Sequence, residues 1–94
     1  MDSGKFDPLI HAPNRLQICA LLAPNEAVEF ATLKEQLGVS DSVLSKHIKA
    51  LEDADYVFPE KRLQNGRPRT WLTLTKQGRK AFADHVKALK AIVG

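Results

Sequence analysis

Apolar residues in the first half of the chain recur at spacings typical of helices. Between residues 16 and 23 only Gln17 is polar. A helix that is apolar on nearly every side needs cover from several neighbours, part of which a second subunit could supply. Phe30, Leu33 and Leu37 then recur at i, i+3 and i+7, the pattern of a short amphipathic helix.

A third helix is predicted directly after this one, with only a short turn between them. Gly38 stands where a helix end favours a left-handed residue, and Ser40 can cap the helix that follows. We expect this helix to reach about Ala54, with an apolar stripe formed by Leu44, Ile48 and Leu51. Two short helices joined in this way are typical of a helix-turn-helix.

An entry helix precedes these elements. Asp7 followed by Pro8 is a favourable helix start, because aspartate caps the first turn and proline suits the first helical position. Pro13 pushes the residue before it away from helical angles, so we expect the helix to restart at Asn14.

After Asp55 the pattern changes to one typical of a β-hairpin. Residues 56–58 and 70–74 are rich in β-branched and aromatic side chains, and Asn65-Gly66 between them suits a tight turn. Pro59 indicates that the first strand is an edge strand or is kinked.

A last helix is expected to begin after Thr75, a suitable cap, and to reach about Val93. Its apolar stripe is formed by Phe82, Val86, Leu89 and Val93. The whole pattern predicts a mainly α fold with one small β-hairpin.

Length and composition limit the possibilities further. Ninety-four residues suffice for one hydrophobic core, so we predict a single domain over residues 1–94, with a loose terminus over residues 1–6. The apolar runs are too short to span a bilayer, and the start of the chain lacks the pattern of a secretory signal. With Cys19 as its only cysteine, the chain is expected to be cytoplasmic, with that thiol buried and inert.

Charge is distributed unevenly along the chain. Residues 1–60 carry five basic and ten acidic side chains, whereas residues 61–94 carry nine basic side chains and Asp84 alone as an acid. The two parts therefore have net charges of −5 and +8, which sum to the +3 of the whole chain. Such a basic segment indicates either a polyanionic partner or a solubilising face.

The ordered set of motifs resembles the winged helix-turn-helix regulators of the MarR and ArsR type, above all short regulators of about this length. The matching segments span residues 7–16, 30–33, 38–48, 51–52, 56–57, 66–70 and 74–79. The resemblance implies that residues 30–54 form the helix-turn-helix, residues 56–74 the wing hairpin and residues 76–93 the C-terminal helix. It also implies that the third helix enters the major groove of DNA, with the wing beside it. The paired cysteines of metal-sensing ArsR proteins are missing here, so metal sensing by that route is not expected. A histidine–carboxylate site is the alternative, but no recognisable ligand spacing supports it, and neither a metal nor a cofactor is predicted.

On this interpretation two groups of side chains would contact DNA, although on sequence grounds alone each could be a merely solvated surface. The third helix would offer base-reading and phosphate-binding groups from Asp41, Ser42, Val43, Ser45, Lys46 and Lys49. The wing would offer phosphate or minor-groove contacts from Lys61, Arg62, Arg67 and Arg69.

The three histidines are interpreted separately. His47 adjoins the apolar stripe of the third helix and could shield the core, contact a phosphate, or do both, with the structural role favoured. His11 and His85 are expected to stand alone and to be structural.

The predicted function is sequence-specific binding of double-stranded DNA by a transcriptional regulator. One domain contacts few base pairs, so we expect a homodimer on a pseudo-palindromic operator. The dimer interface is assigned to the terminal helices, through Leu16, Phe82, Val86, Leu89 and Val93. The alternative is that the last helix folds back onto the first and closes a monomeric core. Repression is favoured over activation, because the sequence includes no further segment that could recruit polymerase.

Two other classes of function compete with this prediction. A winged helix can serve as a protein-interaction module without binding DNA, and the basic wing is the feature that argues against it. An enzyme is disfavoured, because the chain has neither a glycine-rich phosphate loop nor a Cys–His or Ser–His pair at a motif spacing. Nothing in the sequence identifies a small-molecule inducer.

Overall fold

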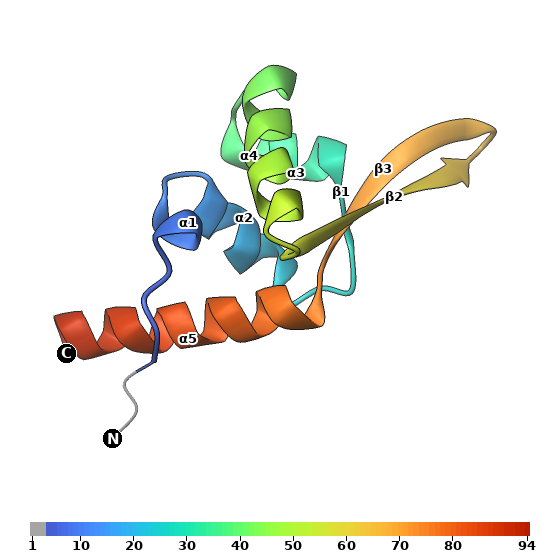
Figure 1. The fold of residues 1–94 in the computed structure, drawn as a ribbon. Helices are drawn as coiled ribbons and strands as arrows, with labels where there is room; N and C mark the ends of the chain where they lie inside the picture. The colour runs from blue at the N-terminus through green and yellow to red at the C-terminus, as the bar shows by residue number, and fades with distance from the viewer. Residues whose placement is uncertain (1–3) are drawn as a thin grey trace.

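The computed structural model describes residues 4–94, and its elements follow the predicted order (Figure 1). The helices are α1 (Pro8–His11), α2 (Arg15–Leu22), α3 (Phe30–Leu37), α4 (Asp41–Asp53) and α5 (Lys76–Val93). The strands are β1 (Val28–Glu29), β2 (Val57–Gln64) and β3 (Arg67–Leu74). The fold is a winged helix-turn-helix, with α3 and α4 as its helix pair and the β2–β3 hairpin as its wing.

The predicted helix caps are confirmed. The Asp7 carboxylate accepts hydrogen bonds from the first backbone N–H groups of α1. The Ser40 hydroxyl accepts one from Val43 N at 3.2 Å, and the Thr75 hydroxyl accepts one from Gly78 N at 2.9 Å. These side chains satisfy donors that the first helical turn leaves without partners, which is why each helix begins where it does.

The hairpin is longer than predicted. Its two strands pair from Val57↔Leu74 to Gln64↔Arg67, so the segment after Pro59 continues as strand rather than as loop. Asn65 and Gly66 both have positive φ, 53° and 76°, as a tight hairpin turn requires. In the described residues β2 pairs with β3 alone, which confirms the edge position expected from Pro59.

The short strand β1 was not predicted. Val28 pairs with Leu72 and Glu29 with Trp71, so β3 becomes the central strand of the order β1-β3-β2. This pairing ties the segment before α3 to the base of the wing.

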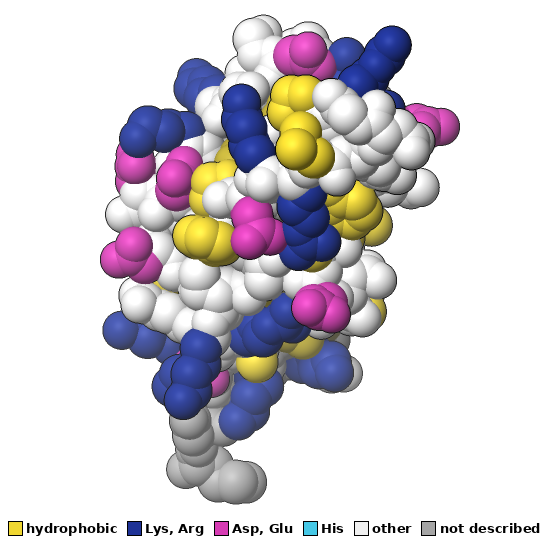
Figure 2. Space-filling view, turned by 90° about the vertical axis from the view of Figure 1, so that its right-hand side faces the viewer, with side chains coloured by type: hydrophobic (Ala, Val, Ile, Leu, Met, Phe, Trp, Pro, Cys, Tyr) yellow, Lys and Arg dark blue, Asp and Glu magenta, His cyan; other side chains and the backbone are white. Residues whose placement is uncertain are grey.

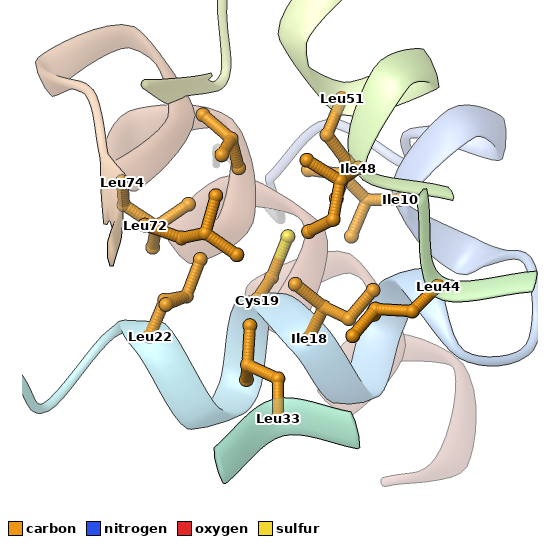
Figure 3. Close-up of a cluster of buried hydrophobic side chains, with 11 residues drawn as sticks. Ile10, Ile18, Cys19, Leu22, Leu33, Leu44, Ile48, Leu51, Leu72 and Leu74 are labelled. Carbon is orange, nitrogen blue, oxygen red and sulfur yellow. The ribbon is translucent and has the colours of Figure 1, made fainter. Parts of the chain in front are cut away.

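The core is built around α2 (Figure 3). Ile18, Cys19 and Leu22 are buried there, facing side chains of α1, α3, α4 and β3. The facing side chains are Ile10, Leu33, Leu44, Ile48, Leu51, Leu72 and Leu74. Most of the cover that the apolar sequence of α2 requires therefore comes from its own domain.

Helix α5 passes beneath this core and extends beyond it (Figure 1). Its buried positions are Gly78, His85 and Ala88, so the buried face differs from the predicted apolar stripe. Of the predicted interface residues, Leu16 and Phe82 are partly buried against the chain's own core. Val86 and Leu89 are half-buried, and Val93 is 81% exposed.

The expectation that His11 and His85 stand alone is wrong. His11 Nδ1 lies 3.2 Å from His85 Nε2, and the backbone N–H of Asp7 donates to His85 Nδ1 at 2.9 Å. Phe6 packs its ring against both imidazoles. Part of the segment expected to be loose is thus tied to α5, while residues 1–3 of that prediction lie outside the described residues. None of the helices in residues 4–94 is long and apolar enough to cross a membrane.

Candidate nucleic-acid interface

Helix α4 separates a buried apolar side from an exposed polar side. Leu44, Ile48 and Leu51 are buried, as the stripe predicted. All six predicted contact residues of this helix are exposed: Asp41, Ser42, Val43, Ser45, Lys46 and Lys49. The fold therefore leaves one face of α4, from its first turn onward, open to a partner.

Two of these side chains already have charged partners. Asp41 forms an ion pair with Lys34, with 2.8 Å between its carboxylate oxygen and the lysine Nζ. This pair links the first turn of α4 to α3. Lys49 pairs with Asp53 one turn further along α4, also at 2.8 Å, and this hydrogen bond together with the carboxylate charge raises the pKa of Lys49. Lys46 forms no ion pair with a carboxylate of residues 4–94.

The wing distributes its basic residues over two faces. Side chains alternate along a strand, and the register places Lys61 opposite Thr70, on the face that carries the buried Leu72. Arg62, Arg67 and Arg69 lie on the other face, with Arg62 directly opposite Arg69. The four wing residues proposed from the sequence are all exposed, but they do not form one cluster.

Acidic and aromatic side chains position the two paired wing arginines. Arg62 Nε donates to Glu60 at 2.8 Å, and its guanidinium lies 5.2 Å from the centroid of the Trp71 ring. Arg69 donates to Glu29 at 3.2 Å, from β3 to the short strand β1. The Arg62–Glu60 pair is exposed and contributes at most about 1 kcal/mol, so Arg62 can exchange its carboxylate for a phosphate at little cost.

A groove of ≈ 330 Å³ separates α4 from the wing. Ser45, Lys49 and Glu52 line it from the helix, and Pro59 and Thr70 line it from the hairpin. Seen from the side on which the wing projects, the surface carries many Lys and Arg side chains, with acidic and apolar side chains among them (Figure 2). Helix α4 and the Lys61 face of the wing are thus the two walls of this groove, while Arg62, Arg67 and Arg69 lie on the opposite face of the hairpin.

The turn from α1 into α2 supplies residues that were not predicted from the sequence. Arg15 Nη1 lies 3.2 Å from His47 Nδ1, and the Asn14 amide lies 3.4 Å from His47 Nε2. His47 is half-buried, and burial together with the charges of Arg15 and Lys46 lowers its pKa. No sequence signal links Arg15 with His47, because the two residues lie 32 positions apart.

Other candidate chemistry contributes little. Burial, reinforced by the Asp7 charge, raises the pKa of Cys19 to about 12, so the thiol remains protonated and unreactive at neutral pH. Within the described part of the chain, no three His, Cys, Asp or Glu side chains are arranged to hold a metal ion.

Comparison with known proteins identifies one family and one general architecture. A family model described as a winged helix DNA-binding domain matches residues 14–93. An uncharacterized protein of Methanocaldococcus jannaschii is 39% identical over 72 residues, which are 77% of this chain and 78% of that protein.

Solved structures give the same picture. A transcriptional regulator homologue from Pyrococcus horikoshii superposes with a TM-score of 0.85 at 28% identity, covering 90% of this chain and 84% of the other. A MarR-family protein from Enterococcus faecalis superposes with a TM-score of 0.75 at 23% identity, covering 90% and 76% of the two chains. At that identity the second likeness supports the fold alone.

Proposed function

Since the chain belongs to the family of winged helix DNA-binding domains, we propose that it recognises specific sequences in duplex DNA and represses transcription as a homodimer. The observation that carries the proposal is the exposed polar face of α4, flanked across a groove by a basic wing. A major groove about 12 Å wide admits one α-helix, so α4 can enter it with the wing alongside.

We assign base reading to the first half of α4. Ser42 and Ser45 can donate or accept hydrogen bonds, Val43 can contact a thymine methyl group, and Lys46 can donate to guanine. Asp41 can accept from cytosine, although its pair with Lys34 must first loosen or be shared.

We assign affinity to the basic side chains of the wing and to Lys49. Their contacts with phosphates release counterions, which makes binding strongly dependent on salt. Lys61 and Arg67 can bind phosphates directly, because neither forms an ion pair with a carboxylate of residues 4–94. Lys49, Arg62 and Arg69 would exchange their present carboxylate partners for phosphates.

The homodimer in this proposal depends mainly on the second half of α5. Leu16 and Phe82 are partly used by the chain's own core, whereas Val86 and Leu89 are half-buried. Ile92 is 70% exposed and Val93 81% exposed, on a helix end that extends beyond the body. Such an apolar surface is suited to a second copy of the same helix. A dimer covers two half-sites and excludes other proteins from its DNA, which is the basis for proposing repression.

The proposal is tested by selecting bound fragments from a pool of random duplexes and measuring affinity over a range of salt concentrations. We expect enrichment of an inverted repeat, with affinity that falls linearly in log–log form as salt increases. Failure to enrich any sequence, together with no salt-dependent binding to random duplex, would contradict the proposal. That result would favour the protein-interaction module.

A further inference from the structure

A second basic site lies on the side of α4 away from the wing. We name it the Arg15 site and define it as Asn14, Arg15 and His47. Helices α1 and α2 lie on one side of α4 and the wing lies on the other (Figure 1). Contacts of α4 with α1 and with α2 fix the turn between these helices against it.

The guanidinium of Arg15 is held in place by the protein. Its Nε donates to the Leu9 carbonyl oxygen at 2.6 Å, and its Nη1 donates to His47 Nδ1 at 3.2 Å. These bonds use two of the five N–H donors of a guanidinium. The other three have no hydrogen-bond partner within residues 4–94, so a preoriented, half-buried arginine retains donors for a ligand.

His47 faces this arginine as a neutral imidazole. Its Nδ1 accepts from the Arg15 guanidinium, which can only donate, so the ring proton lies on Nε2. Lys46, the neighbour of His47 on α4, is exposed.

Charge distinguishes this site from the rest of the interface. Lys49, Arg62 and Arg69 each have a carboxylate within ion-pair distance. Among the described residues neither Arg15, Lys46 nor His47 has one. The lowered pKa of His47 has the same origin in part, since the charges of Arg15 and Lys46 act on its ring. A cluster with no internal counter-charge is complementary to an external anion.

We infer that the Arg15 site binds a phosphodiester of the DNA backbone that flanks α4 on the side opposite the wing. Arginine suits this ligand, because its planar fork can donate two parallel hydrogen bonds to phosphate oxygens. With α4 in the major groove, one backbone would run past the wing and the other past the turn from α1 into α2. The recognition helix would then be held from both sides, which fixes its register on the bases.

This inference rests on the proposed function, and a matched pair of variants separates the two. Arg15→Gln removes one charge from the site. Arg79→Gln is the control, because Arg79 is likewise anchored to backbone carbonyl oxygens, those of Ala23 and Asn25, but lies on α5. We expect Arg15→Gln to reduce the slope of log affinity against log salt by about 0.9. Between 50 and 200 mM salt, the affinity of the wild type would then fall by a factor about 3.5-fold larger than that of the variant. Arg79→Gln should keep the wild-type slope.

Thermal unfolding of both variants shows whether each is folded. A second experiment alters the DNA in place of the protein. Uncharged methylphosphonate linkages are placed one at a time along both strands of the selected duplex. We expect wild-type binding to weaken at two separate groups of phosphates, and only one group should cease to matter in Arg67→Ala/Arg69→Ala.

The outcomes of these measurements separate the two proposals. Two results would overturn the inference and leave the proposed function standing. One is a single group of phosphates at which methylphosphonates weaken binding, and the other is a folded Arg15→Gln variant that keeps the wild-type slope of log affinity against log salt. A wild type that binds no duplex at all would overturn both.

Discussion

Two residues that precede α4 determine where this helix begins. Gly38 ends α3 with φ of 65°, a left-handed conformation that glycine adopts without strain. Ser40 then caps α4 through its hydroxyl, which also lies 3.2 Å from the Ser42 hydroxyl. Together these two residues fix the position of the first turn of α4, which carries the exposed side chains of Asp41, Ser42 and Val43.

Base reading by this turn is testable with single substitutions. Replacing Ser42 or Lys46 by Ala should cost about 1–3 kcal/mol of binding free energy at the selected site, because a good base contact contributes that much to discrimination. Binding to random duplex should weaken less. Competition gel shifts on both duplexes measure the difference, with Lys49→Ala as a phosphate-type comparison that should weaken both equally. An equal effect of Lys46→Ala on both would place that lysine on the backbone, and no effect on either duplex would remove it from the interface.

Gly78 has a packing role that its sequence position does not reveal. It lies in the first turn of α5, where a Cβ atom would overlap the backbone carbonyl of Tyr56. Alanine normally stabilises a helix by about 1 kcal/mol relative to glycine. Here α5 cannot move away from Tyr56 to make room for a Cβ atom, because it would break the Thr75 cap and the hydrogen bond from Thr75 N–H to Tyr56 O at 3.0 Å.

We therefore expect Gly78→Ala to lower the free energy of unfolding by about 1–3 kcal/mol, as overpacking does. Urea titration followed by circular dichroism measures this change. Gln77→Ala, at the exposed neighbouring position, should change stability by less than about 0.5 kcal/mol. A more stable Gly78→Ala variant would show that the turn at Tyr56 yields easily.

At the scale of elements, the features that could be predicted from the sequence are those determined by residues close together along the chain. The caps at Asp7, Ser40 and Thr75 act on N–H groups two or three positions away, so they could be recognised locally. Strand β1 has two residues, and its pairing partner Leu72 is far away in sequence, so no local pattern announces it. The hairpin was predicted too short, because Glu60, Lys61 and Arg62 look like a polar loop until they are paired with β3.

In the candidate interface, too, some features could be predicted from the local sequence and others depend on residues far apart in the chain. Exposure of the polar side of α4 followed from its apolar stripe, and the basic wing followed from composition. The pairing of Arg69 with Glu29, 40 positions apart, and the contact of Arg15 with His47 depend on how helices and strands pack. Which cations remain without a counter-charge is therefore a property of the tertiary structure.

The wing should contribute affinity with little discrimination between sequences. Replacing Arg67 and Arg69 together by Ala should weaken binding to every duplex and reduce the slope of log affinity against log salt by about 0.9 for each phosphate that is no longer bound. Stability should change by no more than about 0.5 kcal/mol, since both side chains are exposed. Fluorescence anisotropy at several salt concentrations gives the slope, and Lys76→Ala/Lys80→Ala, which removes two charges from α5, is the control. An unchanged slope in the wing variant would argue against backbone contacts by these arginines.

The link between α1 and α5 should make stability depend on pH. His85 is fully buried, and as a neutral ring it accepts from Asp7 N–H and donates toward His11. Burial and the charge of His11 lower the pKa of His85, while the Asp7 carboxylate acts in the opposite direction. The unfolded chain therefore binds more protons below about pH 7, so stability falls as pH falls through the unfolded pKa of 6.5.

Thermal unfolding between pH 7.5 and 5.5 tests this dependence. We expect each unit by which the pKa of His85 is lowered to remove about 1.4 kcal/mol of stability once pH is below both values. His85→Gln should reduce the dependence, because the amide can accept and donate without titrating. His47, whose pKa is also lowered, contributes with the same sign, so His47→Gln serves as the comparison. If His85→Gln follows the wild-type pH profile, the His85 ring is not the group responsible.

At the scale of the whole molecule, the two ends of the fold differ in character. The α4–wing surface combines exposed hydroxyls and cations around a groove. The far end of α5 instead exposes Ile92 and Val93 beyond the body of the domain. One molecule therefore offers a surface suited to a polyanion and, on a separate element, an apolar surface suited to a second subunit.

The role of that helix end is tested by replacing Leu89 by Asp. Leu89 is half-buried on α5, and the neighbouring buried position Ala88 faces the domain's own interior. In a subunit interface, an unpaired carboxylate at position 89 would split the dimer and leave a folded monomer, whose operator binding is weak because it contacts one half-site. In a closed monomeric core it would instead produce a poorly folded chain, since a buried charge without a partner is strongly destabilising. Sedimentation and circular dichroism on the same sample distinguish the two results. Ala83→Asp, at an exposed position of α5, should change neither. A wild-type protein that sediments as a monomer at micromolar concentration would remove the dimer from the proposal. The protein would then have to recognise DNA as a single domain.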